Sequence, residues 1–267
     1  MYKIDVKSVA VKIHTKEDFI KMRRAGKLAA QTLDYITDFV KIGVTTDELN
    51  TLCHNFIVNH GAIPAPLGYR GFPKSICTSI NHVVCHGIPD ATKLKDGDVI
   101  NIDVTVIVDG YHGDTSRMYW TGTPSVKAQR LTMVAYESMM KGIEQVKPGA
   151  TLGDIGHAIQ THAERHNYSP VQDYCGHGIG RVFHDEPNIL NFGKKGTGLK
   201  LEQGMFFTVE PMVNAGGHQC KLSQVDKWTV TTKDRSLSAQ FEHTIGVTED
   251  GYEIFTISEK ELHFPPY

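Results

Sequence analysis

The stretch KIGVTTDEL at residues 41–49 has a counterpart in KPGATLGDI at residues 147–155, and this recurrence decides the fold that we expect. Lysine, glycine and threonine recur at a spacing of 106 residues, and so do His60 and His166. In the first copy, Thr45 can cap a helix that has Glu48 at its third position. Two copies at so long a spacing predict two similar half-domains. The alternative is a chance likeness between two common helix-cap patterns.

Helical stretches flank both copies of the repeat. Residues 16–40 carry apolar side chains at helical spacing and are followed by Gly43, a typical helix stop. A second helix is predicted from Thr45 to about His60. The second copy has its own pair of helical stretches, at about 125–146 and 152–167.

Strands follow the helices in hairpins and do not alternate with them one by one. This order predicts an α+β fold with an antiparallel sheet and helices on one face. No linker rich in Pro, Gly or Ser separates the halves. We therefore expect a single domain over residues 1–267, with halves at about 14–120 and 121–260.

The composition is that of an ordinary globular protein with its own core. The chain has 267 residues, of which 40% are hydrophobic. Its 28 basic and 30 acidic residues give a net charge of −2, and so charge offers no reason to expect a nucleic-acid or membrane partner. The first residues, MYKIDVKSVAVKIH, lack the apolar stretch of a signal peptide, and no later segment is apolar enough to span a membrane. A soluble, intracellular protein is expected.

The five cysteines do not form a recognisable framework. Their number is odd and they contain no CxxC pair, which fits neither a zinc ribbon nor a set of disulfides. We expect buried free thiols. The residues concerned are Cys53, Cys77, Cys85, Cys175 and Cys220.

A predicted hairpin at residues 99–120 places two carboxylates on one face. The sequence VINIDVTVIVDGYHGDTSRMYW has Asp-Gly between two β-rich runs, a strong turn signal. With a two-residue loop, Asp103 pairs with Ser116, and Asp114 pairs with Thr105. Asp103 and Asp114 are then diagonal neighbours on the same face. A three-residue loop would place them on opposite faces.

Such a pair is costly without a cation between the carboxylates, although both could instead be solvated or hydrogen-bonded at strand ends. Glu210 interrupts the apolar run 205–213, and Glu242 does the same in 239–247. His177 lies among the glycines of CGHGIG, where its ring can point into a cleft. Taken alone, such a residue is more often a histidine whose hydrogen bonds are satisfied within the protein, or one at the surface. Together, two Asp, two Glu and one His suit two divalent ions that share bridging carboxylates.

These residues lie in a series of motifs that resembles the methionine aminopeptidases, in particular the short bacterial type I enzymes. The motifs run in family order, and the likeness covers about residues 14–260. They are GYRGFPKSICTSIN (68–81), CHGIP (85–89), NIDVT (101–105), GDTS (113–116), GHGIGR (176–181), FHDEP (183–187), FTVEPMVN (207–214) and SLSAQFEHT (236–244). The resemblance implies the pita-bread fold, in which two related halves surround a dinuclear metal site.

The resemblance also implies roles for individual residues. It makes Asp103, Asp114, His177, Glu210 and Glu242 the ligands of two divalent ions, Co, Mn, Fe or Zn, with Asp114 and Glu242 bridging. It adds a site for Na⁺ or K⁺ near Asn81, Val83 and Ser238.

The implied reaction removes the initiator methionine from nascent polypeptides, with a preference for a small second residue. Glu210 would act as general acid and base, His184 would donate to the developing oxyanion, and His86 would contact a peptide nitrogen. The methionine side chain would fill a pocket for which the candidates are Tyr69, Phe72, Cys77, Phe183 and Trp228, although such aromatic residues are as often simply core. A cytoplasmic monomer that meets its substrates at the ribosome is expected.

Three positions depart from the family pattern, and two other functions stay open. Phe72 stands in place of a common tyrosine, Pro66 in place of a frequent cysteine, and Val182 in place of a usual glycine, which affects the expected shape of the pocket. An Xaa-Pro aminopeptidase or prolidase would use the same metal set on the same fold. A catalytically inactive peptide-binding module is disfavoured because all five ligand positions are filled.

Overall fold

The computed structural model describes residues 11–267, so the start of the stretch assessed for a signal peptide lies outside the described residues. Four long helices occur, α1 (Lys16–Ile36), α2 (Thr46–Asn59), α3 (Val126–Ile143) and α4 (Leu152–Arg165), with short 3₁₀ helices at Thr37–Phe39 and Tyr69–Gly71. All four predicted helices are present. The first ends earlier than predicted because residues 37–39 tighten into the 3₁₀ form, a frequent end of an α-helix.

Both halves begin their second helix in the same way. Thr45 donates its backbone N–H to the Glu48 carboxylate at 2.7 Å, and the Glu48 N–H donates to the Thr45 hydroxyl at 3.1 Å. In the second half, the Thr151 N–H donates to the Asp154 carboxylate at 2.8 Å. These contacts satisfy backbone groups that a helix start leaves without partners.

The backbone hydrogen bonds around the two repeats match one another. The Gly43 N–H donates to the Leu94 carbonyl at 2.8 Å, and the Gly149 N–H donates to the Leu201 carbonyl, also at 2.8 Å. The predicted pair of related halves is therefore confirmed at the level of hydrogen bonding.

The strands form four antiparallel sheets, where the sequence predicted one. Their order is β1-β4-β2 with β5 beside β4, then β13-β10-β6, β11-β12-β3 and β15-β14-β9-β7-β8. The strands are β1 (Ile63–Pro64), β2 (Cys77–Ile80), β3 (Val83–Cys85), β4 (Val99–Val108), β5 (Tyr111–Trp120), β6 (Ser169–Pro170), β7 (Gly176–Gly178), β8 (Asp185–Ile189), β9 (Phe206–Val209), β10 (Met212–Asn214), β11 (Cys220–Leu222), β12 (Val230–Thr232), β13 (Ser238–Gln240), β14 (His243–Val247) and β15 (Tyr252–Ile254).

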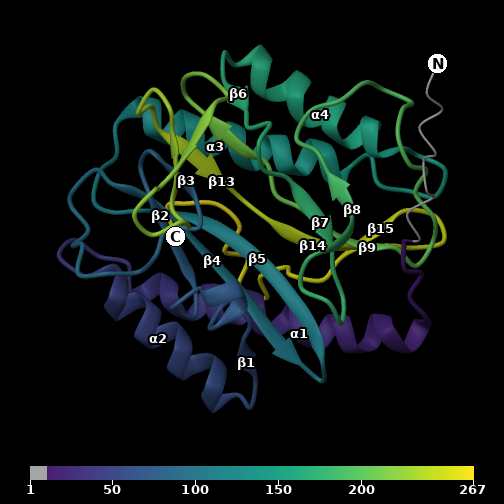
Figure 1. The fold of residues 1–267 in the computed structure, drawn as a ribbon, viewed down its shortest axis with the longest axis horizontal. Helices are drawn as coiled ribbons and strands as arrows, with labels where there is room; N and C mark the ends of the chain where they lie inside the picture. Colours follow the sequence, from purple (N-terminus) through teal and green to yellow (C-terminus); the bar gives the residue numbers. More distant parts are fainter. Residues whose placement is uncertain (1–10) are drawn as a thin grey trace.

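Figure 1 shows α1 and α2 along one side of the strands and α3 and α4 along the other. Each pair covers the strands of its own half. Ile102 and Val104 of β4 are fully buried against α1 and α2, while Phe207 and Val209 of β9 are fully buried in the core that contains α3 and α4. Since side chains alternate along a strand, Asp103 lies on the opposite face of β4. The helices thus leave one face of the strands for the site.

Two further expectations concern thiols and membranes. The five cysteines are free, but only Cys53, Cys77 and Cys85 are buried; Cys175 and Cys220 are partly exposed because they lie near strand ends at the surface. Within residues 11–267, none of the helices combines the length and the apolar character that crossing a membrane requires.

Candidate active site

The hairpin formed by β4 and β5 has the predicted register. Asp103 pairs with Ser116 and Thr105 pairs with Asp114, as the two-residue loop requires. The loop residues Asp109 and Gly110 have φ values of 51° and 78°. Positive values at both positions are typical of a type I′ turn, whose twist matches that of the flanking strands. The two aspartates are therefore diagonal neighbours on one face.

Glu210 and Glu242 lie where two strands pass from one sheet to another. The predicted continuous strands at 205–213 and 239–247 are wrong in this respect, since each is interrupted at its glutamate. Pro211, which has no N–H to donate, follows Glu210 and explains the first break. The pairing Val209–His243 before the break and Met212–Gln240 after it has one continuous register, which places Glu210 opposite Glu242.

The two halves meet beside these glutamates. The Glu242 N–H donates to the Ser116 carbonyl at 3.1 Å, and the Thr115 hydroxyl donates to the Glu242 carbonyl at 2.7 Å. Two positions further along, the Thr244 hydroxyl donates to the Asp114 carbonyl at 2.7 Å. These bonds hold the hairpin of the first half against β14 of the second, so that Asp114 and Glu242 converge.

His177, in β7, completes the group with a single nitrogen. Its Nδ1 lies 3.0 Å from the Gly178 carbonyl, which can only accept, so Nδ1 carries the proton and donates. Its Nε2 then has a free lone pair, 3.7 Å from the Asp114 carboxylate and 3.5 Å from the Glu210 carboxylate. Burial lowers the pKa of His177 to about 4, which keeps the ring neutral near pH 7.

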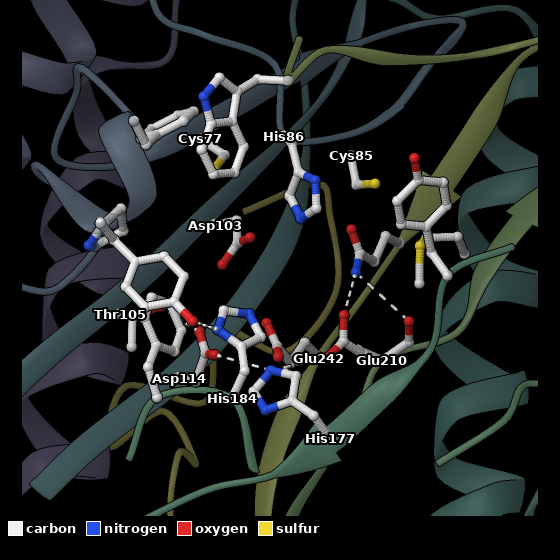
Figure 2. Close-up of a pocket in the computed structure, with 18 of the residues that line it drawn as sticks. Cys77, Cys85, His86, Asp103, Thr105, Asp114, His177, His184, Glu210 and Glu242 are labelled. Carbon is white, nitrogen blue, oxygen red and sulfur yellow. Dashed lines mark hydrogen bonds and ion pairs between the residues drawn. The ribbon is translucent and has the colours of Figure 1, made fainter. Parts of the chain in front are cut away.

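Three neighbouring polar side chains orient the carboxylates. The Thr105 hydroxyl donates to Asp114 at 2.6 Å, and the Thr208 hydroxyl donates to Glu210 at 2.7 Å. The other oxygen of Glu210 accepts from the Gln240 amide at 3.1 Å. Each bond occupies part of a carboxylate and leaves the rest turned toward the same space, where Figure 2 shows Asp103, Asp114, Glu210, Glu242 and His177 grouped together.

The four carboxyl groups are held where burial disfavours their ionised forms. Burial raises the pKa of Asp103 to about 7 and that of Glu210 to about 8. The pKa values of Asp114 and Glu242 are raised well above their usual range by burial and by the neighbouring carboxylates. Among residues 11–267, no Lys or Arg forms an ion pair with any of the four.

This donor set fits divalent metal ions. One ligand atom each from Asp114, His177 and Glu242 lies within 4.8 Å of the other two, and all three residues are buried. Carboxylate oxygens with one imidazole suit Mn, Fe, Co or Zn, and bound cations would restore the ionised form of the acids. The residues present therefore fit a metal site.

A cavity of about 340 Å³ opens above the carboxylates. One wall is aromatic: Tyr69 lies 4.9 Å from Phe183, and Phe72 packs edge-on against Trp228 at 5.2 Å, measured between ring centroids. The Tyr69 hydroxyl lies 2.9 Å from His184 Nδ1. The structure brings together every residue predicted for metal binding, catalysis and the substrate pocket, namely Tyr69, Phe72, Cys77, His86, Asp103, Asp114, His177, Phe183, His184, Glu210, Trp228 and Glu242.

Comparison with known proteins identifies the family. The model of metallopeptidase family M24 matches residues 20–249. The chain belongs to this family. Methionine aminopeptidase of Rickettsia prowazekii is 70% identical over 259 residues, which are 97% of this chain and 100% of that protein. Methionine aminopeptidase of Salmonella typhimurium is 55% identical over 95% of this chain and 96% of its own length. Within family M24, the chain thus falls among the methionine aminopeptidases, as its motifs indicated.

Solved structures agree with this placement in the M24 family. The crystal structure of methionine aminopeptidase from R. prowazekii superposes with a TM-score of 0.92 and covers 93% of this chain and 100% of that chain. Prolidase from Pyrococcus horikoshii is 19% identical, with a TM-score of 0.71 over 94% of this chain and 65% of its own, and shares the fold alone. The observed architecture is accordingly the pita-bread fold.

The positions that depart from the family pattern differ in their consequences. Pro66 and Phe72 line the cavity, whereas Val182 is 53% exposed and is not among the lining residues. At the predicted monovalent-cation site, the Ser238 N–H donates to the Asn81 carbonyl at 2.8 Å, and Val83 begins β3 two residues after Asn81. These residues lie together, outside the cavity.

Sequence reasoning missed several residues of this M24 site. Thr208 and Gln240, which hold Glu210, were not singled out, although each is two residues from a predicted ligand and therefore on the same face of its strand. The same spacing rule would have found them. The lining residues Asp173 and Tyr174 carry no such signal, because the loop that holds them has no regular period.

Proposed function

We propose that this chain is a metal-dependent aminopeptidase that removes the N-terminal methionine from nascent proteins and peptides, with a preference for a small second residue. The observation that carries the proposal is the convergence of four carboxylates and His177 on the floor of a cavity whose wall is aromatic. The M24 membership supports it, because that family consists of metallopeptidases.

We propose that two divalent ions would be held by Asp103, Asp114, His177, Glu210 and Glu242. When bound, such ions supply hydroxide at neutral pH and polarise the scissile carbonyl. Co, Mn, Fe and Zn all suit the donor set, and availability in the cell decides among them. Asn81, Val83 and Ser238 are proposed to hold Na⁺ or K⁺, which would stabilise the junction of β3 and β13.

Glu210 is the proposed general acid and base. Its carboxylate takes the proton of the attacking water and returns it to the leaving amine. The hydrogen bonds from Thr208 and Gln240 fix both of its oxygens, so the Glu210 side chain does not have to change rotamer to transfer the proton.

His184 and His86 are proposed to bind the reacting peptide unit from opposite sides of the cavity (Figure 2). The pKa of His184 is lowered to about 3 and that of His86 to about 4, in both cases chiefly by burial, so both rings are neutral near pH 7. A neutral imidazole with one N–H can donate to a developing oxyanion or to a peptide group without an added charge. Tyr69 orients the ring of His184 through its hydroxyl.

The methionine side chain is proposed to lie against the aromatic wall formed by Tyr69, Phe72, Phe183 and Trp228, beside Cys77. A thioether gains about 0.3–1.5 kcal/mol from contact with aromatic edges. One methylene is worth only about 1–3 kcal/mol in discrimination, so selectivity for methionine requires the shape of the whole pocket. His86, next to the wall, would exclude a large second residue.

Hydrolysis of Met-Ala-Ser compared with Xaa-Pro peptides tests the proposal directly. We expect kcat/KM for the methionyl peptide to exceed that for every Xaa-Pro peptide by at least 100-fold in the metal-loaded enzyme. Faster cleavage of the proline substrates would assign a prolidase instead. Peptide binding without metal-dependent turnover would make the chain an inactive binding module.

Initiator methionine is found on chains as they are synthesised, so we place the activity in the cytoplasm, on nascent N-termini at the ribosome. The cavity is lined by one copy of the chain, and we propose a monomer. Sedimentation of the metal-loaded protein as a single 29.7 kDa species is the expected result. A dimer at micromolar concentration would contradict this part of the proposal.

A further inference from the structure

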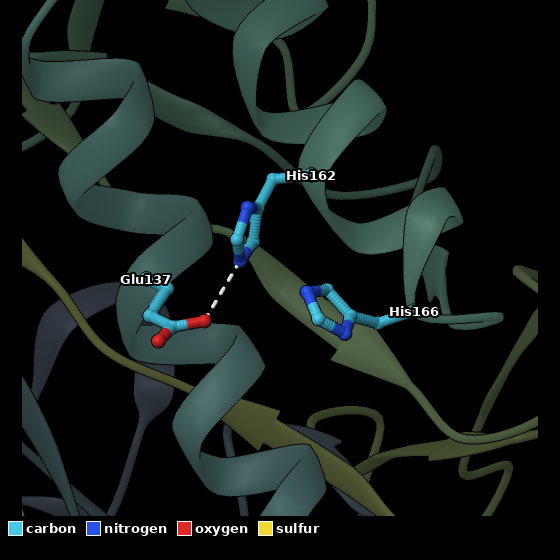
Figure 3. A group of neighbouring side chains, drawn as sticks. All are labelled: Glu137, His162 and His166. Atoms are coloured by element: carbon cyan, nitrogen blue, oxygen red, sulfur yellow. Dashed lines mark hydrogen bonds and ion pairs between the residues drawn. The ribbon is translucent and has the colours of Figure 1, made fainter.

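A second group of metal-ligating side chains lies between the two helices of the second half. Glu137 belongs to α3, His162 belongs to α4, and His166 is the cap residue that directly follows α4. One ligand atom from each lies within 4.8 Å of the other two. Figure 3 shows the three side chains turned toward one another. All three are partly exposed, so ions can reach them from solvent.

The geometry of this group is that of a three-ligand site. His162 and His166 are one helical turn apart and present their rings on one face, with centroids 4.9 Å apart. Glu137 comes from the neighbouring helix, and its Oε2 lies 2.9 Å from His162 Nε2. Around a tetrahedral ion, ligand atoms lie roughly 3.3 Å apart, so small rotations of the side chains complete the arrangement.

The first half has a different contact at the corresponding place. Phe56 and His60 lie 106 residues before His162 and His166, the spacing of the repeat. There, Tyr35 of α1 stacks on Phe56 at 4.6 Å, and the ring of His60 lies 4.2 Å from that of Phe56. The first half thus joins its helices by aromatic stacking. At the corresponding positions, the second half has side-chain atoms that can bind a metal ion.

Glu137 has no permanent cation as a partner in the part of the chain that the structure describes. Lys141, one turn further along α3, pairs instead with Glu144 at 2.9 Å. Among residues 11–267, the one ion-pair contact of Glu137 is with the imidazole of His162. A carboxylate and two imidazoles are therefore available to a cation.

We propose that Glu137, His162 and His166 form a third divalent-metal site, which binds a first-row transition ion such as Zn²⁺ and clamps α3 to α4. Two imidazoles and one carboxylate select zinc-like ions over Mg²⁺ and Ca²⁺, with water in the remaining position. The apolar core between the helices and the strands separates this site from the cavity. The site therefore affects stability and leaves turnover unchanged.

The test counts total divalent ions per chain in the full-length enzyme. Protein loaded with its active-site metal is equilibrated with excess Zn²⁺, freed of unbound ion, and analysed by metal mass spectrometry. The total number of ions per chain does not change when Zn²⁺ replaces the metal in the cavity, because one ion leaves for each ion that binds. We expect the unaltered chain to hold one ion more than His162→Ala or His166→Ala. His157→Ala, which removes an exposed histidine from the same helix, serves as the matched control and should retain the extra ion.

A second measurement uses the more conservative Glu137→Gln. The affinity of Glu137→Gln for Zn²⁺ at this site should fall at least tenfold. The rise in Tm that Zn²⁺ causes should disappear in Glu137→Gln and in His166→Ala. It should persist in His157→Ala. Hydrolysis of a methionyl peptide should stay within twofold of the unaltered enzyme in every variant, which also shows that the variants are folded. Equal ion totals in the unaltered chain and His166→Ala, or a zinc-dependent rise in Tm that persists in that variant, would overturn the proposal.

Discussion

Glu210 is held by hydrogen bonds to both of its carboxylate oxygens. Its carboxylate accepts from Thr208 and Gln240, lies 3.5 Å from His177, and stands opposite Glu242 across the broken strand pair. A group fixed in this way can move a proton with little reorganisation. Burial raises its pKa to about 8, which opposes the negative charge that the reaction needs.

Glu210→Gln should therefore separate chemistry from binding. Gln has similar size but cannot accept a proton, so we expect kcat for a methionyl peptide to fall by at least about 10²-fold with KM changed by less than about threefold. Steady-state kinetics under fixed metal loading measure both values. Glu186→Gln, in an exposed carboxyl group near the cavity, is the matched control and should leave both unchanged. Retention of full kcat in Glu210→Gln would remove this residue from its acid/base role.

His14 makes stability depend on pH. Its ring stacks on Phe206 at 4.0 Å, its Nδ1 is buried with no hydrogen-bond partner among residues 11–267, and burial lowers its pKa to about 4. Between pH 4 and 6.5, the unfolded chain therefore binds a proton at His14 that the folded chain does not. The free energy of unfolding should fall as the pH is lowered through this range.

His14→Phe should flatten that dependence, since Phe keeps the stack on Phe206 and has no proton to bind. Chemical denaturation of both proteins at several pH values, at constant metal loading, gives the difference between the two slopes. The metal ligands titrate in both proteins, so their contribution cancels in the difference. Parallel curves for the two proteins would show that His14 is not the cause.

At the scale of elements, a close contact between β5 and α1 helps to position the site. Gly113 precedes Asp114, a proposed metal ligand, and a Cβ at Gly113 would lie 2.3 Å from the carbonyl carbon of Ala25, an entirely buried residue of α1. Because that atom is backbone, the strand and the helix would have to separate. The absence of a side chain at Gly113 therefore fixes how close Asp114 lies to the first helix.

Gly113→Ala should consequently lower the free energy of unfolding by about 3 kcal/mol or more, at the upper end of the effects of overpacking. Gly217→Ala is the control, since its nearest atom would be 3.8 Å away and a change within about 0.5 kcal/mol is expected. Urea denaturation measures both. A loss below 1 kcal/mol in Gly113→Ala would show that α1 is free to move away from β5.

Elements also show how far periodicity alone can predict. The hairpin register was predictable because Asp109-Gly110 strongly favours one turn type, and side-chain alternation then orders every residue of the pair. The breaks in the strands at Glu210 and Glu242 were not predictable, because the apolar pattern of the sequence continues through both positions. Only the competition between two sheets for the same strands decides where each strand changes partner.

At the scale of the whole molecule, the site depends on both halves. Asp103 and Asp114 come from the first half, and His177, Glu210 and Glu242 come from the second. Cations held by these proposed ligands would thus link the halves directly. The buried ion pair between Arg117 and Asp34, at 2.6 Å, and the bond from Ser258 to Asp34, at 2.8 Å, link α1 and β5 to the C-terminal segment as well.

Removal of the metal with a chelator should abolish activity and also lower Tm, since the carboxylates then repel one another without a counter-charge. Return of the divalent ion should restore both. We propose that the chain is one domain, and so the loaded protein should unfold in a single calorimetric transition that coincides with the change in Trp fluorescence. Two separate transitions, or activity that persists in metal-free protein, would contradict this account.

The internal repeat extends beyond the two helix-cap segments. LKDGDVINID at residues 94–103 matches LEQGMFFTVE at 201–210, at a spacing of 107 residues. The aligned Gly97 and Gly204 both have positive φ, at 86° and 93°. The same alignment places Asp103 on Glu210, so internal symmetry alone relates one ligand of the first half to one of the second.

The sequence by itself determined the four helices, the hairpin register, the related halves and the identity of the acidic residues, because each follows from local spacing, turn chemistry or an internal repeat. Only the tertiary structure decided that the five candidate ligands share one space, that Glu210 faces Glu242, and that Val182 lies outside the cavity. The physical reason is that these relations depend on how separate strands pack and change sheets, and residues more than a hundred positions apart carry no local signal of their contact.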